Sequence, residues 1–217
     1  MRQDLKGNYQ PSKGIIHQFC SWGICLMLSL GTSLNAPAAP VEQTAVFAGG
    51  CFWGVDAVFR HVKGVSHVVS GYAGGGAATA HYDQVSKGDT GHAESVRVSF
   101  DPAKVSYQQL LQVFFSVAHD PTQLDRQGPD FGTQYRSAIF YTSDEQQAAA
   151  RSTIDQLNAA HAFSRPIVTQ LVPLQQFFPA EAYHQNYLAL HPNQPYIVFN
   201  DMPKLVQLRK QWSALYQ

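Results

Sequence analysis

The stretch that most constrains how this chain can fold is residues 49–54, GGCFWG. It follows an apolar run at residues 44–48 that has the length of a strand, and it precedes apolar residues that recur with the spacing of one helix face. These residues are Val55, Val58, Phe59 and Val62. The two glycines before Cys51 allow a tight backbone turn and the close approach of another molecule. The stretch predicts a strand, a sharp turn and a helix, with Cys51 at the N-terminus of the helix.

Cys51 is the first candidate for a reactive group. Unpaired backbone N–H groups and the positive end of the helix dipole favour an anion at a helix N-terminus. A cysteine in that setting can have a pKa below that of a free thiol, and the thiolate is the reactive form. Phe52 and Trp53 add apolar surface beside the sulfur. The alternative is that Cys51 is a small buried apolar residue, as many single cysteines are.

The composition excludes several classes of protein. With 217 residues and 45% hydrophobic content, the chain can form one well-buried domain and does not require two. Its formal net charge is zero and it has no cluster of Lys and Arg, so we expect no nucleic-acid partner. Three cysteines form neither a disulfide framework nor a zinc pair, and nine histidines lack ligand spacing. We therefore expect no metal and no bound cofactor.

The N-terminal residues have the pattern of an export signal. Basic residues up to Lys13 precede a short apolar run at residues 19–30, and small residues and prolines follow at residues 35–40. We expect residues 1–40 to be a signal peptide with a short linker, cleaved near Ala36 or Ala38. The alternative is an uncleaved membrane anchor, although the apolar run is short for a transmembrane helix.

Export has consequences for the rest of the chain. We expect residues 41–217 to be one domain that is periplasmic or extracellular, monomeric and without stable membrane association after cleavage. Cys51 would then be the only cysteine of the mature protein, because Cys20 and Cys25 both lie in the leader.

Helix and strand patterns alternate along the remaining sequence. Further strands are predicted at residues 65–69, 95–100, 138–141 and 167–172. Helices are predicted at residues 107–118 with Ser106 as N-cap, from Ser143 (a capping box with Gln146) to about Ala160, and at residues 177–190. A glycine-rich loop from residue 71 to 94 and a second loop at residues 119–137 separate them. This pattern predicts a mixed fold with one sheet and helices packed against it.

Three residues in the irregular segments complement the cysteine. A carboxyl group desolvated at Glu94 can stay protonated at neutral pH and donate a proton. Tyr82 and Tyr135 are phenolic donors that can bind a developing oxyanion. The alternatives are ordinary: such tyrosines are often packing residues, and a loop glutamate is often solvated. Sequence spacing does not show whether the four side chains converge.

Residues 50–54 (GCFWG) resemble the signature of the peptide methionine sulfoxide reductase A family. Supporting motifs occur in the family's order at residues 71–75 (GYAGG), 91–94 (GHAE), 119–122 (HDPT), 132–137 (GTQYRS) and 183–185 (YHQ). The resemblance covers roughly residues 44–205. It implies an α+β fold, a two-layer sandwich with a ferredoxin-like core, in which residues 41–217 are the catalytic domain.

The resemblance also implies a chemistry for the site. Cys51 would attack the sulfur of a methionine S-sulfoxide, free or in a protein, and Glu94 would protonate the departing oxygen. Tyr82 and Tyr135 would hydrogen-bond that oxygen. The substrate-binding residues would be Phe52 and Trp53, which form the apolar pocket for the methyl group, and Asp130, which holds the backbone side of the substrate. The product at Cys51 would be a sulfenic acid.

Regeneration of the cysteine is where the chain departs from many relatives, which carry further cysteines near the C-terminus. None follows Cys51 here. The resemblance therefore implies an external thiol reductant of the thioredoxin, glutaredoxin or glutathione type. The alternative is that Cys20 or Cys25 resolves Cys51, which requires an uncleaved leader.

Two other classes of function are compatible with the same residues. A thiol hydrolase or transferase would pair Cys51 with a histidine such as His92 or His184. A non-catalytic module would use Phe52 and Trp53 to bind methionine-rich peptides.

Overall fold

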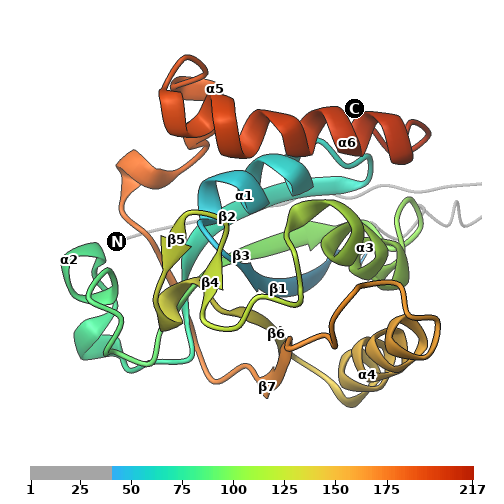
Figure 1. Ribbon diagram of the computed structural model, residues 1–217, viewed down its shortest axis with the longest axis horizontal. Helices are drawn as coiled ribbons and strands as arrows, with labels where there is room; N and C mark the ends of the chain where they lie inside the picture. The colour runs from blue at the N-terminus through green and yellow to red at the C-terminus, as the bar shows by residue number, and fades with distance from the viewer. Residues whose placement is uncertain (1–40) are drawn as a thin grey trace, which may run out of the picture. The chain divides into compact units, whose positions relative to one another are not determined.

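The computed structural model describes residues 41–217, so the predicted signal peptide, with Cys20 and Cys25, lies outside the described residues. The described part forms one domain on a six-stranded sheet of order β7-β6-β1-β3-β2-β8 (Figure 1). The strands are β1 (Gln43–Gly49), β2 (Val65–Ala73), β3 (Ala93–Phe100), β6 (Ser137–Tyr141), β7 (Gln170–Pro173) and β8 (Phe177–Pro179). Neighbouring strands are antiparallel except β6 and β7.

The centre of the sheet has ferredoxin-like topology. The chain runs through β1, α1 (Phe52–Arg60), β2, β3, α3 (Tyr107–Val113) and β6, and these four strands lie in the order β6-β1-β3-β2. Both helices contribute to one hydrophobic cluster with the same face of the sheet. The structure therefore confirms the α+β sandwich with a ferredoxin-like core.

The alternation of side chains along β1 divides the core into two sides. Phe47 points toward the helices, where its ring stacks on Phe59 of α1 at 5.0 Å and on Phe114 at 4.9 Å. Val46 and Ala48 point to the opposite face and belong to a smaller apolar cluster of mostly short side chains. Most of the buried apolar surface thus lies between the sheet and the helices that carry the site.

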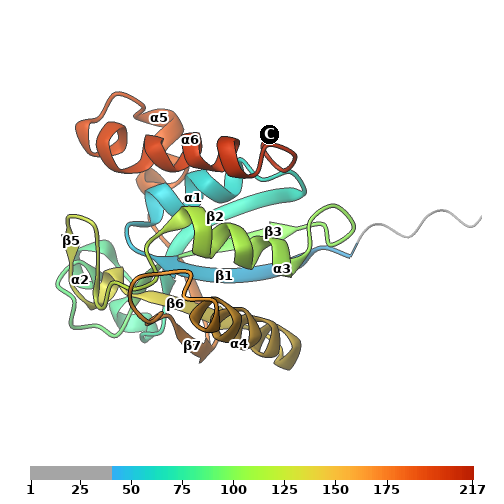
Figure 2. The same ribbon diagram turned by 45° about the vertical axis from the view of Figure 1, so that its right-hand side comes forward.

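Further helices pack around this core (Figure 2). α4 (Asp144–Ala159) packs on α3 and β6, and α6 (Met202–Gln211) packs on α1. α5 (Tyr187–Leu190) also contacts α1. No helix among residues 41–217 combines the length and the hydropathy that a membrane crossing needs.

The residues after α6 return to the turn that follows α1. The Lys63 N–H donates to the Leu215 carbonyl at 2.7 Å, and the Gln217 N–H donates to the His61 carbonyl at 3.0 Å. Val62 and Tyr216 form an isolated antiparallel bridge between these two bonds. The C-terminal end of α1 is thereby fastened by a segment far away in the sequence.

The predicted helix caps are confirmed at Ser106 and in part at Ser143. Ser106 accepts the Gln109 N–H and its own N–H reaches the Gln109 side chain at 2.9 Å, a full capping box. The helix then continues as a wider turn, Phe114–Ala118, to the predicted end. At α4, Ser143 caps Gln146, but the Gln146 side chain accepts the Thr142 N–H instead of completing the box.

Strands β2 and β3 are longer than predicted, and this corrects the position of Glu94. Glu94 lies in β3, directly opposite Tyr72 of β2, and not in a loop. Position 71 of β2 is a glycine because β8 packs closely against it: a Cβ there would lie 2.3 Å from the Phe178 carbonyl oxygen. The long-range pairing of three strands therefore overrides the local loop signal.

Other boundaries also differ from the predictions. Residues 177–190 are not one helix but β8, a 3-10 turn (Ala182–His184) and α5, because the first three residues pair with the edge of β2. β7 begins at Gln170 and not at residue 167. Tyr82 starts the short helix α2 (Tyr82–Val85) and Tyr135 ends a 3-10 turn (Thr133–Tyr135), so neither lies in irregular chain.

Candidate active site

All the predicted site residues line one cavity of about 190 Å³ at the N-terminal end of α1. They are Cys51, Phe52, Trp53, Tyr82, Glu94, Asp130 and Tyr135, and Tyr196 is the eighth lining residue. They come from α1 and its cap, α2, β3, β5 (Asp130–Phe131), the 133–135 turn and the segment before α6. The convergence that the sequence left open is therefore present.

Cys51 is presented as predicted, at the N-cap of α1 directly after β1, with 9% of its surface exposed. The preceding Gly50 has a φ of +89°, and a Cβ there would lie 2.5 Å from the Gln127 side chain. Gln127 belongs to β4 (Arg126–Gln127) and is fixed by two hydrogen bonds, of 3.1 and 3.0 Å, to the backbone of Asp120. Glycine at position 50 is therefore needed both for the positive φ of the turn and for the close packing of the Gln127 side chain against the backbone.

The expected direction of the Cys51 pKa is wrong. Burial raises the pKa of the thiol, and the charges of Glu94 and Asp201 raise it further. The Trp53 backbone N–H and the Lys204 ammonium act in the opposite direction without outweighing burial. The helix N-terminus is there, but removal from water dominates, so the resting group is a thiol.

Glu94 has the protonation that the sequence suggested. It is 2% exposed, and burial raises its pKa to about 8, with a further contribution from Asp130. The Phe52 N–H donates to Oε2 at 3.0 Å, which lowers the pKa in part. This bond also ties the carboxyl group to the first residue of α1. A protonated acid therefore stands beside the thiol at neutral pH.

The two phenols are held by contacts outside the cavity. The Tyr82 N–H donates at 3.0 Å to Glu181, whose other oxygen accepts the Tyr72 hydroxyl at 2.8 Å. The turn that ends at Tyr135 is tied down by Arg136, which donates to the carbonyls of residues 91, 92 and 133. Burial raises the pKa of both phenols, so both remain hydrogen-bond donors at neutral pH.

An aromatic wall fixes the indole of Trp53. Its ring stacks on Tyr187 at a centroid distance of 3.7 Å, and its N–H donates to Nδ1 of His184 at 3.2 Å. The His184 ring also lies 5.0 Å from Phe52 and 4.4 Å from Tyr82. Neither Tyr187 nor a role for His184 in positioning was inferred from the sequence, although His184 lies in the 183–185 motif.

Asp130 is held by Tyr196, whose hydroxyl donates to Oδ2 and whose ring meets Trp53 edge-on at a centroid distance of 5.9 Å. Burial raises the pKa of Asp130, and this hydrogen bond lowers it. Tyr196 lies 66 residues further along the chain. No local pattern marks it in the sequence, so the prediction missed it.

His92 and His184 do not offer Cys51 a base. The ring nitrogens of His92 are both engaged with the glycine-rich loop, at the Gly75 N–H and the Gly76 carbonyl. His184 accepts the Trp53 N–H, so its second nitrogen carries the hydrogen, and burial lowers its pKa. Neither is a free acceptor facing the thiol, which removes the basis for the hydrolase alternative. Residues 41–217 contain no cluster of metal-ligating side chains.

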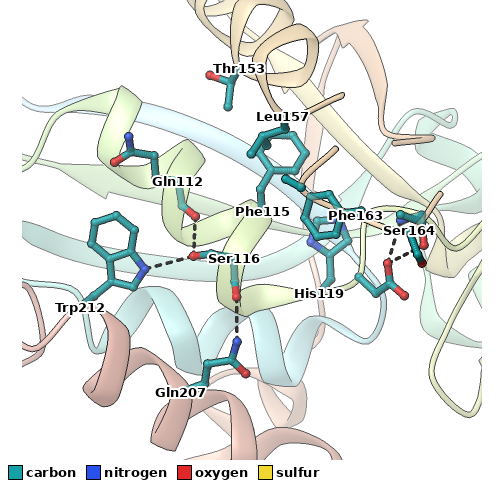
Figure 3. A pocket seen from close by; sticks show the side chains of 13 residues that line it. Gln112, Phe115, Ser116, His119, Thr153, Leu157, Phe163, Ser164, Gln207 and Trp212 are labelled. Atoms are coloured by element: carbon teal, nitrogen blue, oxygen red, sulfur yellow. Dashed lines mark hydrogen bonds between the residues drawn. The ribbon is translucent and has the colours of Figure 1, made fainter. Parts of the chain in front are cut away.

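A larger cavity, of about 670 Å³, lies away from Cys51 between α3, α4 and α6 (Figure 3). His119 lies in its wall, but its ring nitrogens are bound to the Phe114 carbonyl and to the Ser137 hydroxyl. Trp212 and Gln207 are likewise engaged, both with Ser116. Size alone therefore does not mark the reactive centre of this fold.

Comparison with known proteins agrees with this geometry. The family model described as peptide methionine sulfoxide reductase matches residues 43–216. The chain therefore belongs to the peptide methionine sulfoxide reductase family. It is 57% identical over 183 residues to the peptide methionine sulfoxide reductase MsrA 2 of Mesorhizobium japonicum, covering 84% of this chain and 94% of that protein. It is 50% identical to the MsrA of Chromobacterium violaceum, covering 81% and 99%.

Solved structures share the fold. Reduced Mxr1 from Saccharomyces cerevisiae is similar with a TM-score of 0.65 and 32% identity, covering 70% of this chain and 87% of that chain. Methionine sulfoxide reductase A of Corynebacterium diphtheriae is similar with a TM-score of 0.63 and 33% identity, covering 72% and 78%.

Proposed function

We propose that this chain is a peptide-methionine (S)-S-oxide reductase that repairs free and protein-bound methionine sulfoxide. The observation that carries the proposal is the convergence of a cysteine, a protonated carboxyl group and two phenols in one small cavity with an aromatic wall. The chain's membership of the family supports it. A non-catalytic methionine-binding module would not need a buried acid with a pKa of about 8 beside the thiol.

The proposed reaction transfers one oxygen atom. The Cys51 sulfur attacks the sulfoxide sulfur, and Glu94 gives its proton to the sulfoxide oxygen. The sulfur–sulfur bond formed in this attack and the sulfur–oxygen bond of the substrate then break, the oxygen passes as a hydroxyl group to the Cys51 sulfur, and methionine leaves. Cys51 is oxidised by two electrons to a sulfenic acid while the substrate sulfur is reduced. The Glu94 carboxylate takes up the proton that the Cys51 thiol releases, so the step as a whole neither gains nor loses a proton.

The remaining residues bind and orient the substrate in this proposal. Tyr82 and Tyr135 donate hydrogen bonds to the oxygen as it gains negative charge. Phe52 and Trp53 contact the methyl group, since sulfur–aromatic contacts contribute roughly 0.3–1.5 kcal/mol each. Asp130, held by Tyr196, accepts a hydrogen bond from the backbone side of the substrate.

The sulfenic acid requires an external thiol, because Cys51 is the single cysteine of residues 41–217. Two thiols then form a disulfide and release water, which returns Cys51 to the reduced state. A thioredoxin, a glutaredoxin or glutathione would supply them. Resolution by Cys20 or Cys25 is the alternative, and the intact mass of the exported protein distinguishes the two.

Residues 1–40 are part of the same proposal, as a signal peptide and linker that direct the monomeric domain of residues 41–217 to the periplasm or the extracellular space. An exported protein that begins near residue 37 or 39 would support this arrangement and would remove both leader cysteines. A mass that includes Cys20 and Cys25 would contradict it.

The test is single-turnover reduction of the S and R epimers of methionine sulfoxide without added reductant. The expected result is about one methionine per protein, from the S epimer alone, with one sulfenic acid at Cys51. Cys51→Ser should form none. Two equivalents would show that a second thiol participates, and none from either epimer would refute the reductase.

A further inference from the structure

A buried ion pair lies beneath the first turn of α1 and has no part in the mechanism above. Asp201, which immediately precedes α6, is 0% exposed, and its Oδ1 lies 3.1 Å from Nζ of Lys204. Its Oδ2 is buried and has no hydrogen-bond partner among residues 41–217. A buried carboxylate with an unused oxygen is costly, so its retention calls for a reason.

Gly54 shows how closely this pair approaches the helix that presents Cys51. A Cβ at Gly54 would lie 2.1 Å from Oδ1 of Asp201 and 2.5 Å from Nζ of Lys204. Glycine inside a helix costs roughly 1 kcal/mol relative to alanine. Gly54, the last residue of the GGCFWG stretch, therefore leaves the space that the charged ends of Asp201 and Lys204 occupy.

The geometry of a helix start brings the pair to the cysteine. Cys51 is the N-cap of α1 and Gly54 is the third helical residue. Both residues therefore belong to the first turn of the helix, which rises only about 5.4 Å. Groups packed against Gly54 thus lie within one helical turn of Cys51.

The other ionisable groups around Cys51 contribute little charge at neutral pH. Burial raises the pKa of Glu94 and of the phenols of Tyr82, Tyr135 and Tyr196, and it lowers the pKa of His184, so these groups are largely neutral. Burial raises the pKa of Asp130 and of Asp201 as well. The Tyr196 hydroxyl on Asp130 and the Lys204 ammonium beside Asp201 favour the carboxylates, so these are the remaining charged groups.

We propose that the Asp201–Lys204 pair is a positioning element that controls when Cys51 loses its proton. The negative charge of Asp201 destabilises the Cys51 thiolate, and the positive charge of Lys204 offsets part of this effect. The resting cysteine stays a thiol and reacts slowly with oxidants and electrophiles that do not fill the cavity. This inference rests on the proposed function in one respect: it takes Cys51 as the nucleophile.

The balance of charges on Cys51 agrees with this assignment. After burial itself, Glu94 and Asp201 are the groups that raise the pKa of the thiol, whereas Lys204 lowers it. Glu94 loses this influence while it is protonated. Of these two carboxyl groups, Asp201 is then the one whose negative charge still raises the pKa of Cys51.

The test measures the rate at which iodoacetamide alkylates Cys51 in the full chain as a function of pH, by mass spectrometry of the peptide that contains Cys51. Asp201→Asn should move the midpoint down by about one unit. Each unit gives about tenfold more thiolate but about threefold less nucleophilicity, so alkylation below both midpoints should be about threefold faster. Lys204→Gln should not lower the midpoint.

The matched control is Asp101→Asn. Asp101 and Lys104 form a pair with the same i,i+3 spacing at 3.0 Å, but on the surface, and its loss should leave the midpoint unchanged. An unchanged midpoint in Asp201→Asn would overturn the inference. A lower midpoint in both Asp201→Asn and Lys204→Gln would also overturn the inference, because a loosened structure and not the loss of charge would then explain the change. Sulfoxide reduction by the unmodified chain is measured alongside, so that failure of the reductase itself is seen separately.

Discussion

Glu94 and Asp201 are two buried carboxyl groups that flank the same cysteine in opposite ways. Glu94 lies in β3 with no cation beside it among residues 41–217, and burial raises its pKa to about 8. Asp201 lies before α6 with Lys204 at 3.1 Å, which lowers a pKa that burial raises. Glu94 therefore holds a proton that it can give away, whereas Asp201 holds a charge.

The difference shows that burial alone does not assign a role to a carboxyl group. The hydrogen-bond partner sets the protonation state of each carboxyl group. A single backbone N–H from Phe52 leaves Glu94 protonated, whereas the Lys204 ammonium group favours the charged form of Asp201. The site thus has a protonated carboxyl group and a charged one, both against the first turn of α1. Four predictions test how far this contrast holds.

The largest effect is expected for Glu94→Gln. The amide keeps the shape but cannot donate a proton to a leaving oxygen, so the single-turnover rate should fall by roughly 10²–10⁴-fold. Asp201→Asn should change that rate far less. In unmodified protein the rate should rise with pH and level off near 8, because above that pH the loss of the Glu94 proton offsets the gain in Cys51 thiolate. Glu145→Gln, on the exposed surface of α4, is the control, and a similar loss there would contradict the assignment.

Tyr196→Phe should have the next largest effect. It removes the hydroxyl that donates to Asp130 and leaves a half-buried carboxylate without its donor. Hydrogen bonds to charged groups contribute about 1.5–3 kcal/mol, so kcat/KM should fall about 10- to 100-fold. Because Asp130 raises the pKa of both Glu94 and Asp201, the pH profile should shift as well. Unchanged steady-state kinetics would show that Asp130 does not depend on Tyr196.

Gly54→Ala tests the closeness of Asp201 to the helix. The new methyl group would overlap the Asp201 carboxylate, and overpacking should lower the free energy of unfolding by about 1–3 kcal/mol in urea titrations. Combination with Asp201→Ala should cost less than the sum of the two changes. Gly76→Ala is the control, since nothing lies within 4 Å of its Cβ position. Equal costs at both glycines would argue against the close approach.

The last prediction concerns how the stability of the fold depends on pH. The pKa of Glu94 rises on folding from 4.5 to about 8, so the folded state binds the extra proton between these values. Glu94 therefore contributes stability below about pH 4.5 that is lost as the pH rises through about 8, at up to about 1.4 kcal/mol per pH unit. Glu94→Gln should show a flatter dependence of unfolding free energy on pH. Parallel curves would mean that Glu94 is ionised in the folded state.

The parts of the fold that could be predicted from sequence are those with local causes. The run at residues 44–48, the Gly49–Gly50 turn and the apolar face of Val55, Val58 and Phe59 fix a strand, turn and helix within 20 residues. Ser106 begins its helix for an equally local reason, since both hydrogen bonds of its cap lie within four residues. Residue chemistry singled out Cys51, Glu94, Tyr82 and Tyr135 but could not show that they converge. The family resemblance added the substrate-binding roles of Phe52, Trp53 and Asp130.

The errors arose where distant segments meet. Gly71 looks like loop but is a strand residue because β8 passes over it, and residues 177–179 look helical but pair with the edge of β2. The pKa of Cys51 was misjudged because the helix N-terminus is visible in sequence, whereas burial and Asp201 are not. Tyr196 was missed for the same reason.

The fastening of α1 by residues 215–217 bears on the order in which the protein is made. The ribosome synthesises Cys51 and its helix long before it adds Leu215 and Gln217, whose hydrogen bonds close the turn at residues 61–63. Asp201 and Tyr196 also come late. A nascent chain therefore exposes Cys51 in an unfinished setting, and the completed site depends on the final part of the sequence shown here. Translation that stops before Tyr196 yields a chain with Cys51 and Glu94 but without the hydroxyl that holds Asp130 and without the Asp201–Lys204 pair, so the intact domain is the unit of activity.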